Sequence, residues 1–220
     1  MKSIKSATLL ALALAATSFV RAEDKADIKI EFPEPAFAGT PVPAGGIKNL
    51  EKPGAPVKTF AAAKGATIVS KGKTVTASDS APSIGDLAQI VDGDKEGADG
   101  SFVEFAPGPQ SVTVDLGGTF NISAIVLWHY HKQARVYKGV VVEISDDKDF
   151  KTSTIVFNND VDNTVKKGAG KDPAYVETNH GRIVDAKGTK GRYVRCWSNG
   201  NHVDDLNHYT EIEVWGVEAK

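Results

Sequence analysis

One polar and aromatic stretch in the middle of the chain holds the residue types that a binding site needs. The ends of Leu127–Ser145 are apolar and read as strands, and its middle holds two His, two Tyr, one Trp, one Arg and two Lys. Apolar strand residues fix the ends of such a segment, while its polar middle is free to face a ligand. We therefore predict a binding loop here, and its residue types favour a carbohydrate.

A second polar loop, Ser198–Tyr209, has a similar composition. Sugar sites need flat aromatic side chains that stack on a ring, and planar donors and acceptors around its hydroxyl groups. The two loops together supply that mixture. The alternative is that Trp128 and Tyr209 pack in the core and that the His side chains are their hydrogen-bond partners. The predicted ligand-contacting residues are Trp128, His129, Tyr130, His131, Arg135, Tyr137, Asn199, Asn201, Asp204, Asn207, His208 and Tyr209.

The pair His129 and His131 also matches the first half of a transition-metal site. Two His separated by one residue share a strand face, as in some Zn²⁺ and iron centres. The positions that follow hold Lys, Gln, Ala and Arg instead of a third ligand. A His-based metalloenzyme is therefore kept as the third functional hypothesis.

The turn Asp92–Gly97 has the composition of a calcium-binding loop. Its carboxylates alternate, and Gly93 permits a tight turn, which suits the six to eight oxygen ligands of Ca²⁺. It is not an EF-hand, because the twelfth position is Val103. The similar run Asn158–Asn163 lacks Gly and a downstream Glu, so we interpret it as a polar hairpin turn.

The first 22 residues read as a secretory signal peptide. A basic start is followed by the apolar run Ala7–Val20 and by small residues before Glu23. Its removal changes the net charge from −2 to −5, which disfavours nucleic acid and anionic membranes as partners. We therefore predict a secreted or periplasmic protein. Its single Cys, Cys196, excludes an internal disulfide and reads as a small buried residue.

The segment 23–63 differs from the rest of the chain in holding six of the ten Pro. Because Pro fixes φ and removes a donor, we predict an extended arm or linker that does not pair as an interior strand. Its scattered apolar residues favour partial docking. The remaining residues, 64–220, are predicted to form one domain.

This domain has an all-β pattern. Short runs rich in Val, Ile, Thr and aromatics alternate with turn residues, which predicts a β-sandwich or barrel. Ser83–Val91 alone has the spacing of a helical turn. The eight expected strands are Thr67–Val69, Thr74–Ala77, Ser111–Leu116, Ile122–Trp128, Val140–Ile144, Thr154–Phe157, Arg192–Trp197 and Glu211–Trp215.

Several of these runs, in this order, resemble the discoidin family, also called the coagulation factor 5/8 type C or carbohydrate-binding-module-32-like domains. The resemblance covers roughly Gly65–Val217, and the closing pair of motifs is its most specific part. It rests on Lys73–Ser78, Val91–Asp94, Val112–Gly117, Ile122–Leu127, Tyr137–Asp147, Gly191–Arg195 and Glu211–Gly216.

The resemblance implies a jelly-roll sandwich of about eight antiparallel strands with a ligand face of loops at one end. It also implies a structural Ca²⁺ held by the side chains of Asp92 and Asp94, the carbonyls of Gln89 and Gly97, and Glu211. The chain departs from the family pattern where Gly97 and Ala98 replace a ligating Thr, and in its long connection Asp162–Lys190.

Our leading hypothesis is a secreted, non-catalytic module that recognises a carbohydrate or glycoconjugate. The alternative from another class is a protein–protein adaptor of an extracellular or periplasmic complex. Membrane binding ranks last, because only Ile84 and Leu87 offer apolar loop tips.

Overall fold

The computed structural model describes residues 25–36, 46–52, 54 and 56–220. The predicted signal peptide lies outside these residues. Within them the protein is all-β, and the predicted antiparallel sandwich is confirmed. The described part of the chain holds eleven strands and one 3₁₀ helix, Leu87–Val91. None of its helices is long and apolar enough to cross a membrane.

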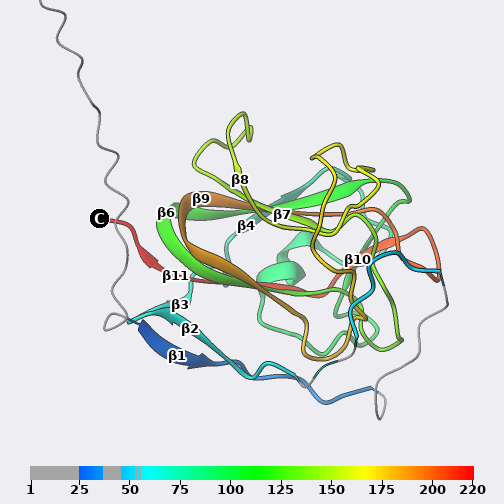
Figure 1. Ribbon diagram of the computed structural model, residues 1–220, viewed down its shortest axis with the longest axis horizontal. Helices are drawn as coiled ribbons and strands as arrows, with labels where there is room; N and C mark the ends of the chain where they lie inside the picture. The colour runs from blue at the N-terminus through cyan, green and yellow to red at the C-terminus, as the bar shows by residue number, and fades with distance from the viewer. Residues whose placement is uncertain (1–24, 37–45, 53, 55) are drawn as a thin grey trace, which may run out of the picture.

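Two long strands, β6 (Gln110–Trp128) and β9 (Arg182–Ser198), organise the sandwich. They pair with each other along most of their length and curve through both layers (Figure 1). The first half of β6 also pairs with β4 (Thr74–Ala77), and the second half of β9 with β7 (Val141–Ser145). The register shifts between Asp115 and Phe120 mark the bend in β6.

The other strands extend the two layers. On one side, β7 pairs with β8 (Thr154–Asn158). On the other, the second half of β6 pairs with β11 (Glu211–Glu218), which pairs with β3 (Thr67–Ile68). A separate small sheet joins β5 (Val103–Phe105) to β10 (Asn207–Tyr209) near the ends of the layers. This small sheet positions residues at the loop end.

The main core fills the space between the layers because strand side chains alternate between two faces. In β9, Val194 and Cys196 are fully buried, while Tyr193, Arg195 and Trp197 are half-buried on the other face, as predicted. Burial raises the pKa of the Cys196 thiol far above its usual value. This cysteine is therefore a packing residue without a reactive thiolate.

Part of the segment 23–63 lies against the sandwich as a third layer. Strand β1 (Lys25–Lys29) pairs with β2 (Thr59–Ala63), below β3 and β11 in Figure 1. A second apolar cluster joins Ile30, Phe32 and Phe60 of this segment to residues on the outer face of β6, β9 and β11. We call the described residues 25–36 and 46–63 (without 53 and 55) the arm.

Candidate binding site

The two predicted binding loops lie side by side at one end of the sandwich. The loop that follows β6 runs from His129 to Val140, and the loop between β9 and β10 runs from Asn199 to Leu206. Backbone bonds join them: Lys138 N–H donates to Gly200 O at 2.9 Å, and Asn199 N–H donates to Lys138 O at 2.7 Å. The second loop therefore reaches the same rim as the first.

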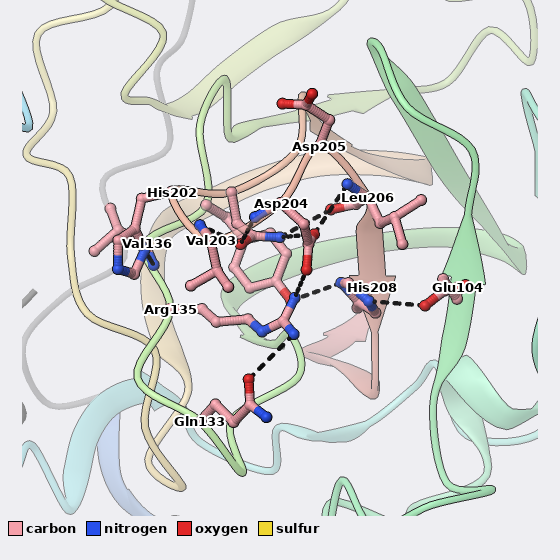
Figure 2. Close-up of polar contacts among 12 residues, drawn as sticks. Glu104, Gln133, Arg135, Val136, His202, Val203, Asp204, Asp205, Leu206 and His208 are labelled. Atoms are coloured by element: carbon pink, nitrogen blue, oxygen red, sulfur yellow. Dashed lines mark hydrogen bonds and ion pairs between the residues drawn. The ribbon is translucent and has the colours of Figure 1, made fainter. Parts of the chain in front are cut away.

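Arg135 lies at the junction of these loops (Figure 2). Its Nη1 donates to Oδ2 of Asp204 at 2.7 Å, and its Nη2 to Oε1 of Gln133 at 3.3 Å. The guanidinium lies 5.1 Å from the ring centre of Tyr130. Only 8% of Arg135 is exposed, while a third of the Asp204 side chain is. A rigid, partly covered guanidinium beside an exposed carboxylate is a fixed set of donors and acceptors.

His208 extends this polar set towards β5 (Figure 2). Its Nδ1 lies 3.0 Å from the hydroxyl of Tyr137, and its Nε2 lies 3.1 Å from Oε2 of Glu104. Burial, and next the charge of Arg135, lower the pKa of His208. A neutral ring that accepts from Tyr137 and donates to Glu104 satisfies both contacts. Glu104 also accepts from the hydroxyl of Ser83 at 2.6 Å.

Aromatic rings complete the rim. The Phe102 ring lies edge-on to Tyr130 at 5.0 Å and to His208 at 5.6 Å. Tyr130 is half-buried. We call this group the rim cluster: Phe102, Glu104, Tyr130, Arg135, Asp204 and His208.

The structure places other predicted contact residues in the interior. Trp128 is fully buried beneath the arm, and its Nε1 donates to Asn179 O at 3.0 Å. Tyr209 is fully buried in the main core. In this conformation neither ring can stack on a sugar, which corrects their expected role. The physical reason for Trp128 is that it shares a strand face with Val126, and the arm covers that face.

The amide side chains of Asn201 and Asn207 are buried and hold the second loop in shape. Asn207 Nδ2 donates to the carbonyls of Ala106 and Gly108, both at 2.9 Å. Asn201 Nδ2 donates to Oδ1 of Asp204 at 2.7 Å. These two residues therefore position the rim rather than face outward, whereas Asn199 is half-buried.

His129 and His131 have separate partners. His129 and Glu177 are both fully buried, with Nδ1 3.0 Å from Oε2, and the His129 ring stacks on Tyr137 at 4.2 Å. His131 is also buried, and its Nε2 lies 2.7 Å from the carbonyl oxygen of Lys95. Among the described residues, no three or more His, Cys, Asp or Glu side chains are grouped as metal ligands.

The predicted calcium turn lies beside the last strand. Gly93 N–H donates to Oε2 of Glu211 at 3.0 Å. Burial raises the pKa of Glu211 to about 8, and the negative charges of Glu213 and Asp92 add to this effect. Lys95 pairs with Glu213 at 2.8 Å. Negative charge thus exceeds positive charge around a nearly buried carboxylate, an environment that a nearby cation would stabilise. In the conformation described, the acidic side chains of the turn and of β11 are not grouped as metal ligands.

Within that turn, the proposed ligands also stabilise the loop itself. Oδ1 of Asp94 accepts from Glu96 N–H at 2.9 Å, and its Oδ2 accepts from the Ser101 hydroxyl at 2.8 Å. The side chain of Gln89 is used for capping, because its Oε1 accepts from Asp86 N–H at 2.6 Å. Gly97 has a φ of 61°, and a Cβ there would lie 3.0 Å from His131 Nε2.

Two members of the rim cluster, Phe102 and Glu104, lay outside the predicted contact residues. Glu104 belongs to a strand of only three residues, too short to be recognised by alternation. Its position between Val103 and Phe105, which are both fully buried, is the signal that could have identified it as outward-facing.

A family model described as "F5/8 type C: NedA-like, galactose-binding domain" matches residues 89–196. No curated protein sequence matches the chain.

Two solved structures from Clostridium perfringens share the fold. A family 89 glycoside hydrolase in complex with GlcNAc-α-1,4-galactose has a TM-score of 0.52 and 21% identity. The match covers 69% of this chain and 15% of the hydrolase, so the chain spans a small part of that enzyme's length. The module CpGH89CBM32-4, in complex with the same disaccharide, has a TM-score of 0.51 and 15% identity; the match covers 70% of this chain and 97% of the module.

Proposed function

We propose that the protein is a secreted, non-catalytic module that binds carbohydrate, because residues 89–196 of its β-sandwich match an F5/8 type C, galactose-binding family model. The sugar site is the rim cluster. Secretion rests on the predicted signal peptide, and the sugar class is supported by the disaccharide complex of the related module.

The observation that carries this proposal is the arrangement of Arg135, Asp204 and Glu104. The guanidinium is held between Asp204 and the Tyr130 ring, and the carboxylates of Glu104 and Asp204 are both partly exposed. Fixed donors next to fixed acceptors match the alternating hydrogen-bonding needs of adjacent sugar hydroxyls. Within the cluster, the half-buried Tyr130 is the aromatic side chain that we assign to the apolar side of a sugar ring.

We also propose a structural Ca²⁺ at the turn Asp92–Gly97. Its ligands would be the side chains of Asp92, Asp94 and Glu211, and the carbonyls of Gln89 and Gly97. When bound, the ion would neutralise the excess negative charge around Glu211 and join the turn to the last strand. This role is structural, and it stabilises the end of the sandwich that carries the loops.

A protein–protein adaptor remains the second candidate, and one observation favours it. Two exposed apolar residues lie near the rim cluster. Val203 is 56% exposed and directly precedes Asp204, and Ile84 is 39% exposed and forms a β-bridge with Glu104. Exposed apolar residues next to polar anchors are also typical of protein interfaces.

A glycan array separates the two candidates. The full mature chain, in buffer with calcium, is expected to bind a subset of glycans, and free sugar should release it. If no glycan binds above background while a secreted protein is captured, the carbohydrate proposal is rejected in favour of the adaptor.

A further inference from the structure

The two loops that carry the rim cluster also line a hollow in the protein. It is a cavity of about 540 Å³, which is within the range of about 300–1,000 Å³ that is usual for small-molecule sites. Its walls come from Pro107–Gly108, from Val136–Gly139, from Asn159–Asp162 and Thr164, and from Asn199, His202 and Asp205. The arm supplies another wall through Gly46–Lys48.

This cavity is directly connected to the rim cluster along the chain. Val136 and Asp205, which line the cavity, each follow a rim residue, Arg135 and Asp204. His202, also in the lining, accepts from Val136 N–H through its Nδ1 at 3.0 Å. The two loops that carry the rim cluster therefore also supply part of the cavity lining.

The lining has mixed polarity and paired charges. Lys48 lies 2.6 Å from Asp162, and Lys138 lies 3.7 Å from Asp205. Because each of these lysines already has an acidic neighbour, the cavity does not favour an anionic ligand. Apolar walls such as Ile47 between polar groups suit a neutral molecule with both hydroxyl groups and apolar faces.

One buried amide in the lining lacks a partner. Oδ1 of Asn159 accepts from Val140 N–H at 2.8 Å, but its Nδ2 has no hydrogen-bond partner among the described residues. Asn159 is only 6% exposed. A buried donor without a partner is costly, but this nitrogen has almost no accessible surface, so only a small shift of the Asn159 side chain would bring it to an acceptor in the cavity.

The arm is fixed in place next to the cavity. Ala174 N–H donates to Asn49 O at 3.0 Å, and Glu51 N–H donates to Ala174 O at 2.9 Å. Arg182 pairs with Glu51 at 2.8 Å. These contacts hold the preceding residues, up to Lys48, against the long connection after β8. The wall is therefore a built part of this chain.

We propose that the cavity is a second subsite and that the ligand is a neutral oligosaccharide of at least two sugar units. One unit binds the rim cluster, and the next crosses the loops and enters the cavity between the arm and Lys138. This inference rests on the proposed carbohydrate function and specifies the length and charge of its ligand.

The test uses an array of neutral glycans with one to six units of galactose, glucose, mannose and N-acetylglucosamine, followed by calorimetry. Lys138→Ala removes a polar wall, and Pro107→Trp places an indole in the cavity from an exposed position. Each of these two variants should lower the affinity for the best oligosaccharide at least tenfold. Each should change the affinity for the monosaccharide that binds the rim cluster less than twofold. Lys151→Ala, on an exposed turn outside the cavity, is the control.

The outcomes are distinguishable. Equal affinity for monosaccharide and oligosaccharide, with no effect of Lys138→Ala or Pro107→Trp, overturns the second subsite and leaves the carbohydrate function intact. A preference for charged glycans on a second, anionic array also overturns it. Absence of binding to every glycan removes both proposals. Melting temperatures of the variants verify that each one is folded.

Discussion

The Nη1 atom of Arg135 lies 2.7 Å from Oδ2 of Asp204, and this pair ties the two loops of the rim cluster together. The other carboxylate oxygen of Asp204 accepts from Asn201 Nδ2 at 2.7 Å and from Leu206 N–H at 3.0 Å. One carboxylate thus fixes both the guanidinium and its own loop. The rim is therefore shaped before any ligand arrives, which reduces the entropy lost on binding.

This relationship predicts different effects for two substitutions of Asp204. Asp204→Asn keeps an oxygen for Asn201 and Leu206 but removes the charge that holds Arg135, whereas Asp204→Ala removes both functions. We expect glycan affinity to fall about tenfold in the first variant and further in the second. Calorimetry measures the affinities. Equal affinities for wild type and Asp204→Asn would show that the ion pair does not organise the site.

Calcium removal should lower the melting temperature. At a Ca²⁺ concentration 100 times its Kd, the ion would add about 2.7 kcal/mol to the free energy of unfolding. For a domain of this size that corresponds to a shift of about 5–10 °C. Thermal melts with calcium and with a chelator measure the shift.

The matched variants for that experiment lie on the same strand, β11. Glu211→Gln should abolish most of the difference between the two melts, because it removes a buried ligand charge. Glu218→Gln, at the exposed end of the strand, should leave the difference unchanged. A melting temperature of the wild type that does not respond to the chelator would reject the site.

The arm should contribute to stability. Ile30 is 2% exposed and packs against Val126 and Trp128. Ile30→Ala should therefore lower the free energy of unfolding by about 2–5 kcal/mol. Val57→Ala, at a residue that is 57% exposed, is the control and should change little. Urea unfolding measures both, and equal midpoints for Ile30→Ala and wild type would mean that the arm does not dock in solution.

Because His208 is buried, we expect the free energy of unfolding to fall in mild acid. Its pKa is lowered by burial and by Arg135, whereas in the unfolded chain it is about 6.5. The unfolded state therefore takes up the proton first as the pH falls. The contribution of His208 is complete above about pH 6.5 and decreases below it, by at most about 1.4 kcal/mol per pH unit.

Urea midpoints between pH 7.5 and 5.5 measure this effect. His208→Gln should show a shallower dependence on pH than the wild type. Burial also lowers the pKa of His180, so this residue contributes to the pH dependence of stability as well. His180→Gln measures that contribution separately. If His208→Gln and wild type have the same slope, protonation of His208 does not oppose folding.

Much of the fold could be predicted from the sequence because period-2 alternation and turn residues are local signals. The strand Thr74–Ala77 has the predicted bounds, and the helical turn expected in Ser83–Val91 is the 3₁₀ helix. The runs Ser111–Leu116 and Ile122–Trp128 were wrongly separated at Gly117. They form one strand because β9 bends with β6 and continues to pair with it.

The long connection Asp162–Lys190 was also misjudged in part, since its residues from Arg182 onward belong to β9. Lys, Gly and Thr dominate this half of the strand, so its pairing depends on β6 and not on its own propensity.

The candidate site was predictable at the level of loops and not of individual side chains. Arg135, Tyr130 and His208 do lie together at the rim, because both loops carry polar residues between buried strands. The burial of Trp128 depends on contacts with the arm, a segment distant in the sequence. Which face of β6 the arm would cover had no local signal.

The most direct test of carbohydrate binding at the rim cluster is calorimetric titration with the best glycan from the array. Arg135→Ala removes charge-assisted bonds worth about 1.5–3 kcal/mol, and the expected loss of affinity is at least tenfold. Arg192→Ala breaks a similar pair, with Asp115, away from the rim, and should bind like the wild type. Wild-type affinity in Arg135→Ala would contradict the assignment of the sugar site to the rim cluster.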